Sequence, residues 1–201
     1  MIPAIIFAAL AWIYILHLTD RSKLPFFKFL IGSVGFFILM MITLQPIITL
    51  PLAKAVAAAA GLIGNITGSF YSYYQYSLIF IRHGSESISL YVDYECSGVI
   101  EIFAFLSLLW FFPLYSWIEK TVISLIGVLY IFVANIIRLT VICLAIYWAG
   151  NDIFFFAHAI LGRIVFYVLS IILFFYVFTR AQIIKQKVGN FTYGQHASDH
   201  I

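Results

Sequence analysis

Long apolar segments are the feature of this sequence that most constrains its fold. A membrane-spanning helix needs about 20 predominantly apolar residues. Because 64% of the residues are hydrophobic and only 9% are charged, against about a quarter in soluble domains, the sequence predicts an integral membrane protein. Five segments qualify as spans, the first of them short: 2–18, 26–50, 97–118, 121–149 and 159–180.

The predicted fold class is an all-α polytopic membrane protein with about five to six transmembrane helices. We expect a single integral membrane domain over residues 1–188, because no polar stretch is long enough to form a separate soluble domain. The polar tail 189–201 is expected to be disordered. Segment 2–18 is interpreted as a retained helix, since it has neither a basic region before it nor an obvious cleavage site.

Basic residues predict the orientation of the helices, because Lys and Arg are enriched in cytoplasmic loops. They follow the first apolar segment, separate the third from the fourth, and follow the fifth. An outer N-terminus and an inner C-terminus satisfy all three places, provided that residues 51–70 do not cross the membrane. The residues concerned are Arg21, Lys23, Lys28, Lys120, Arg180, Lys185 and Lys187.

Residues 51–70 allow two interpretations. The stretch is rich in alanine, but Lys54, Asn65 and Thr67 dilute its hydrophobicity. We favour a re-entrant or interfacial helix, which keeps the orientation described above. The alternative is a sixth span, which would reverse the first two helices and place Arg21 outside.

The segment before the third main helix is predicted to be a small extracytoplasmic element. Its tyrosines, at 71, 73, 74 and 76, are typical of an aromatic belt at the lipid headgroups, although they could instead line a substrate path. Residues 77–82 and 87–93 are two short runs joined by four residues, and the second alternates more clearly. This pattern is compatible with a β-hairpin.

Two cysteines of different character occur in the chain. Cys143 lies in an apolar run and is expected to act as a small hydrophobic residue. Cys96 is flanked by Glu95, Ser97 and Gly98, where a polar segment gives way to an apolar helix. Thiolates become reactive at helix N-termini and near cations, so Cys96 is the candidate nucleophile.

Two further residues are predicted to lie at the same depth as Cys96. Arg138 lies roughly 27 Å of helix rise beyond Lys120, hence in the outer half of its helix. A charge there is costly and usually faces the interior of a bundle. Asn135, one turn earlier, could orient it.

His158 opens the last apolar segment, and Arg163 follows as a second cation.

A cysteine, a histidine and an arginine can together cleave a peptide bond. The thiolate attacks the carbonyl, the histidine transfers the proton, and the arginine stabilises the thiolate or the oxyanion. Transfer of the acyl group to water makes a protease, and transfer to an amine or a similar acceptor makes a transpeptidase. No metal-ligand spacing of the CxxC or HExxH kind is present, so neither a metal nor a cofactor is expected.

Three sequence features resemble those of the exosortase/archaeosortase family, most closely the compact G-type exosortases of Gram-positive bacteria. The features are Glu95-Cys96-Ser97-Gly98, Asn135-Ile136-Ile137-Arg138 and His158, and the resemblance covers roughly residues 90–180. It implies that Cys96 is the nucleophile, Arg138 the stabilising cation and His158 the acid/base. The chain is shorter than many members and lacks some of their N-terminal helices, which leaves the substrate motif and the acceptor open.

The resemblance also implies partners and location. The substrate would be an exported protein with a C-terminal sorting signal, made of a short motif, a transmembrane helix and a basic tail. Membrane lipid and a lipid- or glycan-type acceptor are the other expected partners. The location would be the bacterial plasma membrane, with the active site toward the extracytoplasmic face. The small net charge of +3 gives no indication of nucleic-acid binding.

The alternative function is a non-enzymatic multi-pass subunit, such as a transporter component or a lipid-binding partner. In that case Cys96→Ser would preserve function while changes at Arg138 would not. The sequence weakly disfavours a non-enzymatic subunit, because no paired intramembrane charges outline a substrate path.

Overall fold

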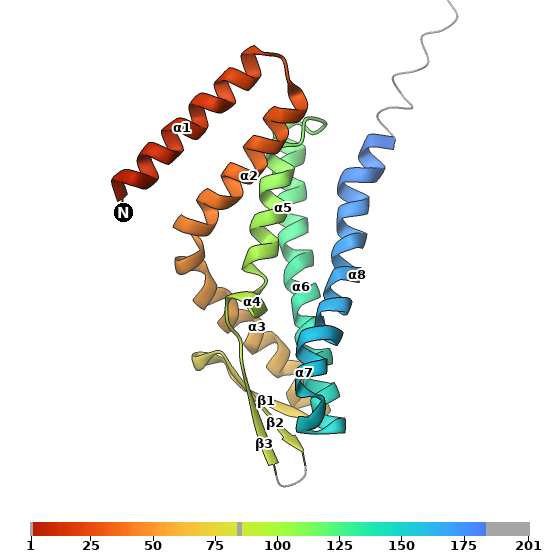
Figure 1. The fold of residues 1–201 in the computed structure, drawn as a ribbon. Helices are drawn as coiled ribbons and strands as arrows, with labels where there is room; N and C mark the ends of the chain where they lie inside the picture. Colours follow the sequence, from red (N-terminus) through yellow and green to blue (C-terminus); the bar gives the residue numbers. More distant parts are fainter. Residues whose placement is uncertain (1, 84–85, 184–201) are drawn as a thin grey trace, which may run out of the picture.

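The computed structural model describes residues 2–83 and 86–183, so the predicted tail 189–201 lies outside the described residues. These residues form an elongated bundle of helices with a small sheet at one end (Figure 1). The main helices are α1 (Ile2–Arg21), α2 (Pro25–Thr43), α3 (Gln45–Thr67), α5 (Val99–Phe111), α6 (Trp117–Ala149) and α8 (Gly162–Phe174).

The helices confirm the predicted class of a mostly helical membrane protein. Within the described residues, four helical stretches are long and apolar enough to cross a membrane: α2, α3, α6 and Asn151–Ile183, the last of which contains α8. Helix α5 is equally apolar but shorter. The first predicted segment, 2–18, does form a helix, α1, but α1 is not among these four.

The sequence predicted a second span over 26–50 and favoured an interfacial helix within 51–70. In the structure the same region forms α2 and α3, and the boundary between them lies at Leu44. The chain bends at Leu44, with Pro46 in the first turn of α3, where proline fits because no backbone donor is needed there. Helix α3 then continues toward the sheet (Figure 1). Residues 51–67 therefore belong to a 23-residue helix that begins at Gln45, and this helix is long and apolar enough to cross a membrane.

One face of α3 carries small residues that pack against the sheet. Its buried positions recur at helical spacing: Ala53, Val56, Ala57, Ala60, Gly61 and Gly64. A Cβ atom at Gly64 would lie too close to the backbone oxygen of Phe70, so glycine allows this strand to approach the helix. This buried stripe explains why α3 lies against protein although polar residues dilute its sequence.

The sheet consists of three antiparallel strands in the order β1-β2-β3: β1 (Phe70–Tyr73), β2 (Leu78–His83) and β3 (Glu86–Tyr91). Strands β2 and β3 confirm the predicted hairpin, with Ile79 opposite Leu90. Strand β1 was not predicted, because its sequence reads as part of the tyrosine cluster. Tyr71 and Tyr73 are exposed on it, as an aromatic belt requires.

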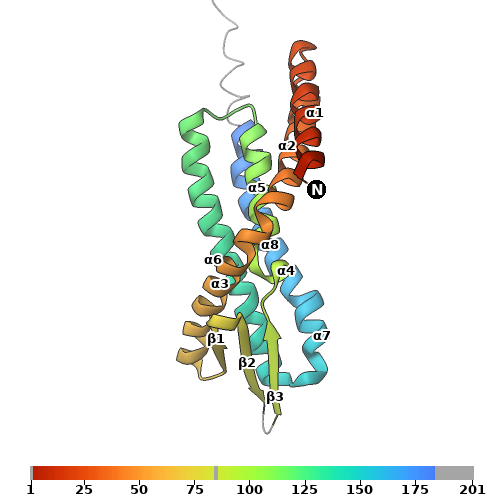
Figure 2. The same ribbon diagram turned by 90° about the vertical axis from the view of Figure 1, so that its left-hand side faces the viewer.

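Two apolar clusters hold the bundle together. The first joins α3, the sheet and the C-terminal half of α6, through residues such as Val56, Ile79 and Ile142. The second joins α2, α5, α6 and α8, through residues such as Phe105 and Phe166. The short helix α4 (Tyr94–Ser97) lies between the sheet and the helices, where the two clusters meet (Figures 1 and 2).

Basic residues lie at the end of the bundle opposite the sheet. Arg21 ends α1, Lys28 lies in the first turn of α2, and Lys120 lies in the first turn of α6 (Figure 1). Helix α6 begins there because Ser116 and Glu119 form a reciprocal capping box. These three basic residues therefore gather at the end opposite the sheet, whereas Arg82 lies in β2.

Candidate active site

Cys96 lies in a single turn of helix that Asp93 holds in place. The Asp93 carboxylate accepts hydrogen bonds from the backbone N–H groups of Glu95 at 3.0 Å and Cys96 at 3.1 Å. Gly98, with a φ of +83°, ends this turn in a conformation that favours glycine. Cys96 therefore lies in a separate turn before the long helix α5, whereas the sequence predicted it at the N-terminus of that helix. Its backbone N–H is bonded to Asp93.

Helix α6 holds the Cys96 turn through two buried side chains. The Asn135 Nδ2 atom donates to the carbonyl oxygen of Cys96 at 2.5 Å, and the Arg138 Nη1 atom donates to the carbonyl oxygen of Glu95 at 3.2 Å. The guanidinium of Arg138 also lies 5.8 Å from the ring centroid of Phe166. The Asn-x-x-Arg spacing thus presents both side chains to successive carbonyls of one turn.

His158 approaches the sulfur from the other side of the site. Its Nε2 atom lies 3.9 Å from Cys96 Sγ, within reach of a hydrogen bond to sulfur. His158 belongs to a π-helical turn, Ala157–Leu161, a distortion that is frequent at functional sites. The ring of Phe154 stacks on the imidazole at 6.1 Å and an interplanar angle of 12°. Stacking therefore fixes the plane of the base.

The surroundings of Cys96 favour the neutral thiol. Burial raises the pKa of the Cys96 thiol to about 11, and the carboxylates of Asp93 and Glu95 act in the same direction. The charge of Arg138 lowers this pKa, but burial outweighs it. The resting cysteine is therefore protonated, where the sequence indicated an activated thiolate, and a base must take its proton when it reacts.

The remaining sequence-predicted residues occupy different places. Ser97 is buried, and its hydroxyl donates to the carbonyl of Tyr94. Glu95 contributes its carbonyl to the site while its side chain is exposed. Arg163 is exposed at the start of α8. Cys143 is fully buried in the first apolar cluster, and both cysteines are free.

Sequence reasoning missed three residues that shape the site. Asp93 was assigned to the end of a strand, although Asp followed by a helical turn is a usual N-cap pattern. Phe154 and Phe166 stack on the histidine and the arginine, and nothing in their apolar surroundings distinguishes them from lipid-facing aromatics. Phe154 lies one helical turn before His158, whereas only packing of α8 on α6 brings Phe166 to Arg138.

Some polar atoms near the cluster have no hydrogen-bond partner among the described residues. They include Asn135 Oδ1, His158 Nδ1 and Glu101 Oε2, which are all buried. No ion pair joins Glu101 to Arg138 in the described part of the chain. Nor do three or more His, Cys, Asp or Glu residues gather there as a metal site would require. The arrangement offers a thiol, an imidazole and a guanidinium.

Comparison with known proteins identifies the family. A family model described as transmembrane exosortase (Exosortase_EpsH) matches residues 1–176, a longer region than the resemblance in the site motifs. No curated protein and no solved structure matches the chain significantly. The match does not distinguish the compact G-type subtype, which stays a prediction. Since the match spans almost the whole membrane domain, the chain belongs to the transmembrane exosortase family.

Proposed function

We propose that this protein is a membrane-embedded cysteine transpeptidase/protease that cleaves C-terminal sorting signals of exported proteins. Cleavage would pass through a thioacyl-enzyme, from which the exported protein is transferred to an acceptor. The observation that carries the proposal is the approach of His158 Nε2 to Cys96 Sγ at 3.9 Å, beside the buried Arg138. A nucleophile within reach of a base is the arrangement required for covalent catalysis.

The proposed reaction begins with a neutral thiol. As the sulfur of Cys96 attacks the scissile carbonyl carbon, His158 takes the thiol proton. The carbonyl oxygen becomes an oxyanion, which Arg138 stabilises in surroundings of low dielectric constant. The C–N bond then breaks, the leaving amine takes the proton from His158, and a thioester remains on Cys96.

The second half of the reaction releases the thioester. An acceptor nucleophile gives its proton to His158 and attacks the thioester carbonyl. Collapse of the tetrahedral intermediate then breaks the C–S bond, and the proton returns to the Cys96 sulfur. Water as acceptor would release a free carboxylate, whereas a lipid- or glycan-type acceptor would leave the exported protein joined to it. Both acceptors remain compatible with the site.

We place the active site at the extracytoplasmic face of a bacterial plasma membrane. Support comes from the basic residues that end α1 and begin α2 and α6, because positive residues favour the cytoplasmic side and these lie opposite the sheet. The Cys96 turn follows β3 directly in the chain and lies where the sheet meets the long helices (Figure 1). An exported substrate would therefore meet Cys96 after crossing the membrane.

The test is processing of an exported reporter that ends in a short motif, a transmembrane helix and a basic tail. The full chain would be reconstituted with this reporter, and the products weighed by mass spectrometry. We expect the wild type and Cys143→Ala to remove the tail, and Cys96→Ala to leave the reporter intact. Equal processing by Cys96→Ala would refute the proposal and favour a non-enzymatic subunit. The product mass also distinguishes hydrolysis from transfer.

A further inference from the structure

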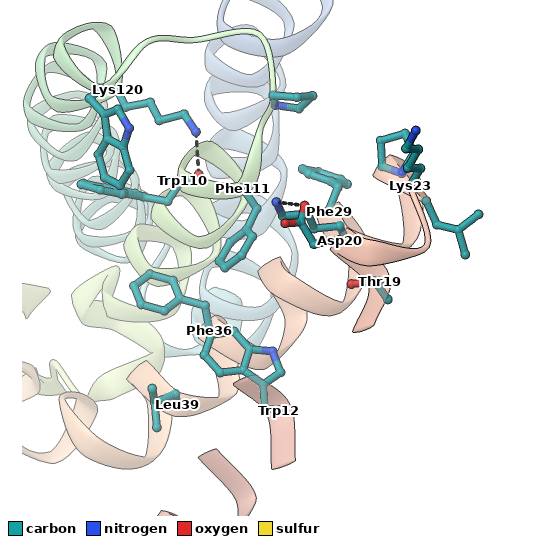
Figure 3. Close-up of a pocket in the computed structure, with 15 residues that line it drawn as sticks. Trp12, Thr19, Asp20, Lys23, Phe29, Phe36, Leu39, Trp110, Phe111 and Lys120 are labelled. Carbon is teal, nitrogen blue, oxygen red and sulfur yellow. Dashed lines mark hydrogen bonds and ion pairs between the residues drawn. The ribbon is translucent and has the colours of Figure 1, made fainter. Parts of the chain in front are cut away.

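A large cavity lies at the end of the bundle opposite the sheet. Its volume is about 930 Å³, within the upper range of ligand pockets. The walls come from α1, α2, the end of α5 and the start of α6 (Figure 3). Cys96, Arg138 and His158 do not line this cavity, so it is not part of the candidate active site.

The inner wall of this cavity is aromatic and apolar. It includes Trp12 of α1, Phe36 of α2 and Phe111 of α5 (Figure 3). The ring centroids of Trp12 and Phe111 lie 6.2 Å apart in an edge-to-face arrangement. The indole N–H of Trp12 donates to the carbonyl of Ile31 at 2.9 Å, so the polar atom of this ring is already bonded. The wall therefore presents a surface suited to hydrocarbon.

The rim of the cavity is positively charged. Three lysines and one aspartate line it: Lys23, Lys28, Lys120 and Asp20. Lys28 Nζ lies 2.6 Å from Asp20 Oδ1, and both side chains are about half exposed to solvent. Lys120 Nζ donates to the carbonyl of Trp110 at 2.7 Å (Figure 3). An ammonium group has three donors, so each of these lysines can donate to a further acceptor.

We propose that this cavity binds an anionic glycerophospholipid of the surrounding membrane leaflet. The phosphate would lie between Lys28 and Lys120, and an acyl chain would lie along Trp12 and Phe36. An apolar wall joined to a basic rim complements an amphiphile that has a negative headgroup. Because the cavity is remote from Cys96, the lipid acts there as a ligand that joins α1 to the bundle, and it is not an acceptor for the thioester.

Lipid binding to the purified full chain tests this proposal without requiring a substrate. The probes are phosphatidylglycerol and phosphatidylcholine with identical acyl chains, titrated in detergent and counted by native mass spectrometry. We expect the wild type to retain phosphatidylglycerol preferentially. The double variant Lys28→Gln/Lys120→Gln should weaken phosphatidylglycerol binding by roughly 10- to 30-fold, because each lysine near an anionic headgroup contributes to affinity.

The matched control also removes two positive charges from the end of the bundle opposite the sheet, but at residues that do not line the cavity. In Arg21→Gln/Arg180→Gln, phosphatidylglycerol binding should stay within about twofold of wild type, since neither arginine lines the cavity. Equal loss in both double variants would overturn the proposal in favour of general surface charge. Equal retention of phosphatidylglycerol and phosphatidylcholine by the wild type would also overturn the proposal. That result would indicate that something other than an anionic lipid, such as another segment of protein, occupies the cavity.

A second variant tests the apolar wall independently of the lysines. Leu39 lines the inner part of the cavity (Figure 3). Leu39→Trp should fill the space for an acyl chain and weaken phosphatidylglycerol binding at least fivefold while the lysines remain. Unchanged binding in a folded Leu39→Trp variant, judged by its thermal transition, would contradict the proposed place of the acyl chain. This comparison stays decisive if the double lysine variant does not fold.

Discussion

Asn135 Nδ2 donates a hydrogen bond to the carbonyl oxygen of Cys96 at 2.5 Å, across 39 positions of sequence. Both residues are buried, so the bond is shielded from water. It ties the turn that carries the thiol to α6, one helical turn from Arg138. The position of the sulfur relative to the arginine therefore depends on this contact.

We predict that Asn135→Asp lowers reporter processing about 10- to 100-fold. The carboxylate would face a carbonyl oxygen, and a buried polar group without a partner costs about 1–3 kcal/mol. Activity relative to wild type at the same pH should recover in part as the pH falls, because a protonated carboxyl can donate again. Asn65→Asp, at an exposed position of α3, is the control. Wild-type turnover in Asn135→Asp would show that the contact does not position Cys96.

We predict that Cys96 reacts slowly with iodoacetamide at neutral pH. Burial holds the pKa of the thiol at about 11, above its ordinary value, so only about one thiol in 10⁴ is ionised at pH 7. The alkylation rate should rise tenfold per pH unit and level off near this pKa. Measurements in a Cys143→Ala background exclude the second thiol.

Arg138→Gln in the same background should raise the apparent pKa of Cys96 further, because the arginine charge favours the thiolate. Arg163→Gln, at an exposed site, should leave it nearly unchanged. An apparent pKa below the ~8.5 of a free thiol would instead indicate a preformed thiolate–imidazolium pair. In that case general-base removal of the thiol proton would be the wrong first step.

We predict that Arg138→Lys reduces processing by at least about 10²-fold. In the wild type, one N–H of the planar guanidinium donates to the Glu95 carbonyl, and its other N–H groups can donate to an oxyanion. A lysine keeps the charge but cannot make both contacts with this geometry. Arg163→Lys should retain activity. The measurement is the single-turnover rate of reporter cleavage, and a normal rate in Arg138→Lys would remove the oxyanion role.

We predict that His158→Ala lowers turnover roughly 10²- to 10⁴-fold, the usual contribution of a general acid or base. His17→Ala is the control, because His17 is exposed on α1 at the other end of the fold. Reporter binding, followed by co-purification, should be the same in both variants. Unchanged turnover in His158→Ala would remove the histidine from the mechanism.

The candidate site was predictable in part because its residues are costly or conspicuous in a membrane chain. Arg138 stands out in an apolar helix, and the helix rise beyond Lys120 sets its depth. The protonation state of Cys96 was not predictable. Neighbouring charges can be read from the sequence, but the burial that dominates the pKa depends on the packing of α4 with α3, the sheet and α6.

The sequence by itself determined the membrane class, the gathering of Arg21, Lys28 and Lys120 at helix ends, and the hairpin of β2 and β3. These properties depend on local hydrophobicity, charge and alternation along the chain. Tertiary structure alone decided the course of α3, the addition of β1, and the contacts of Asn135 and Phe166. Such contacts join residues far apart in sequence, or depend on how one helix packs on another, so no local pattern encodes them.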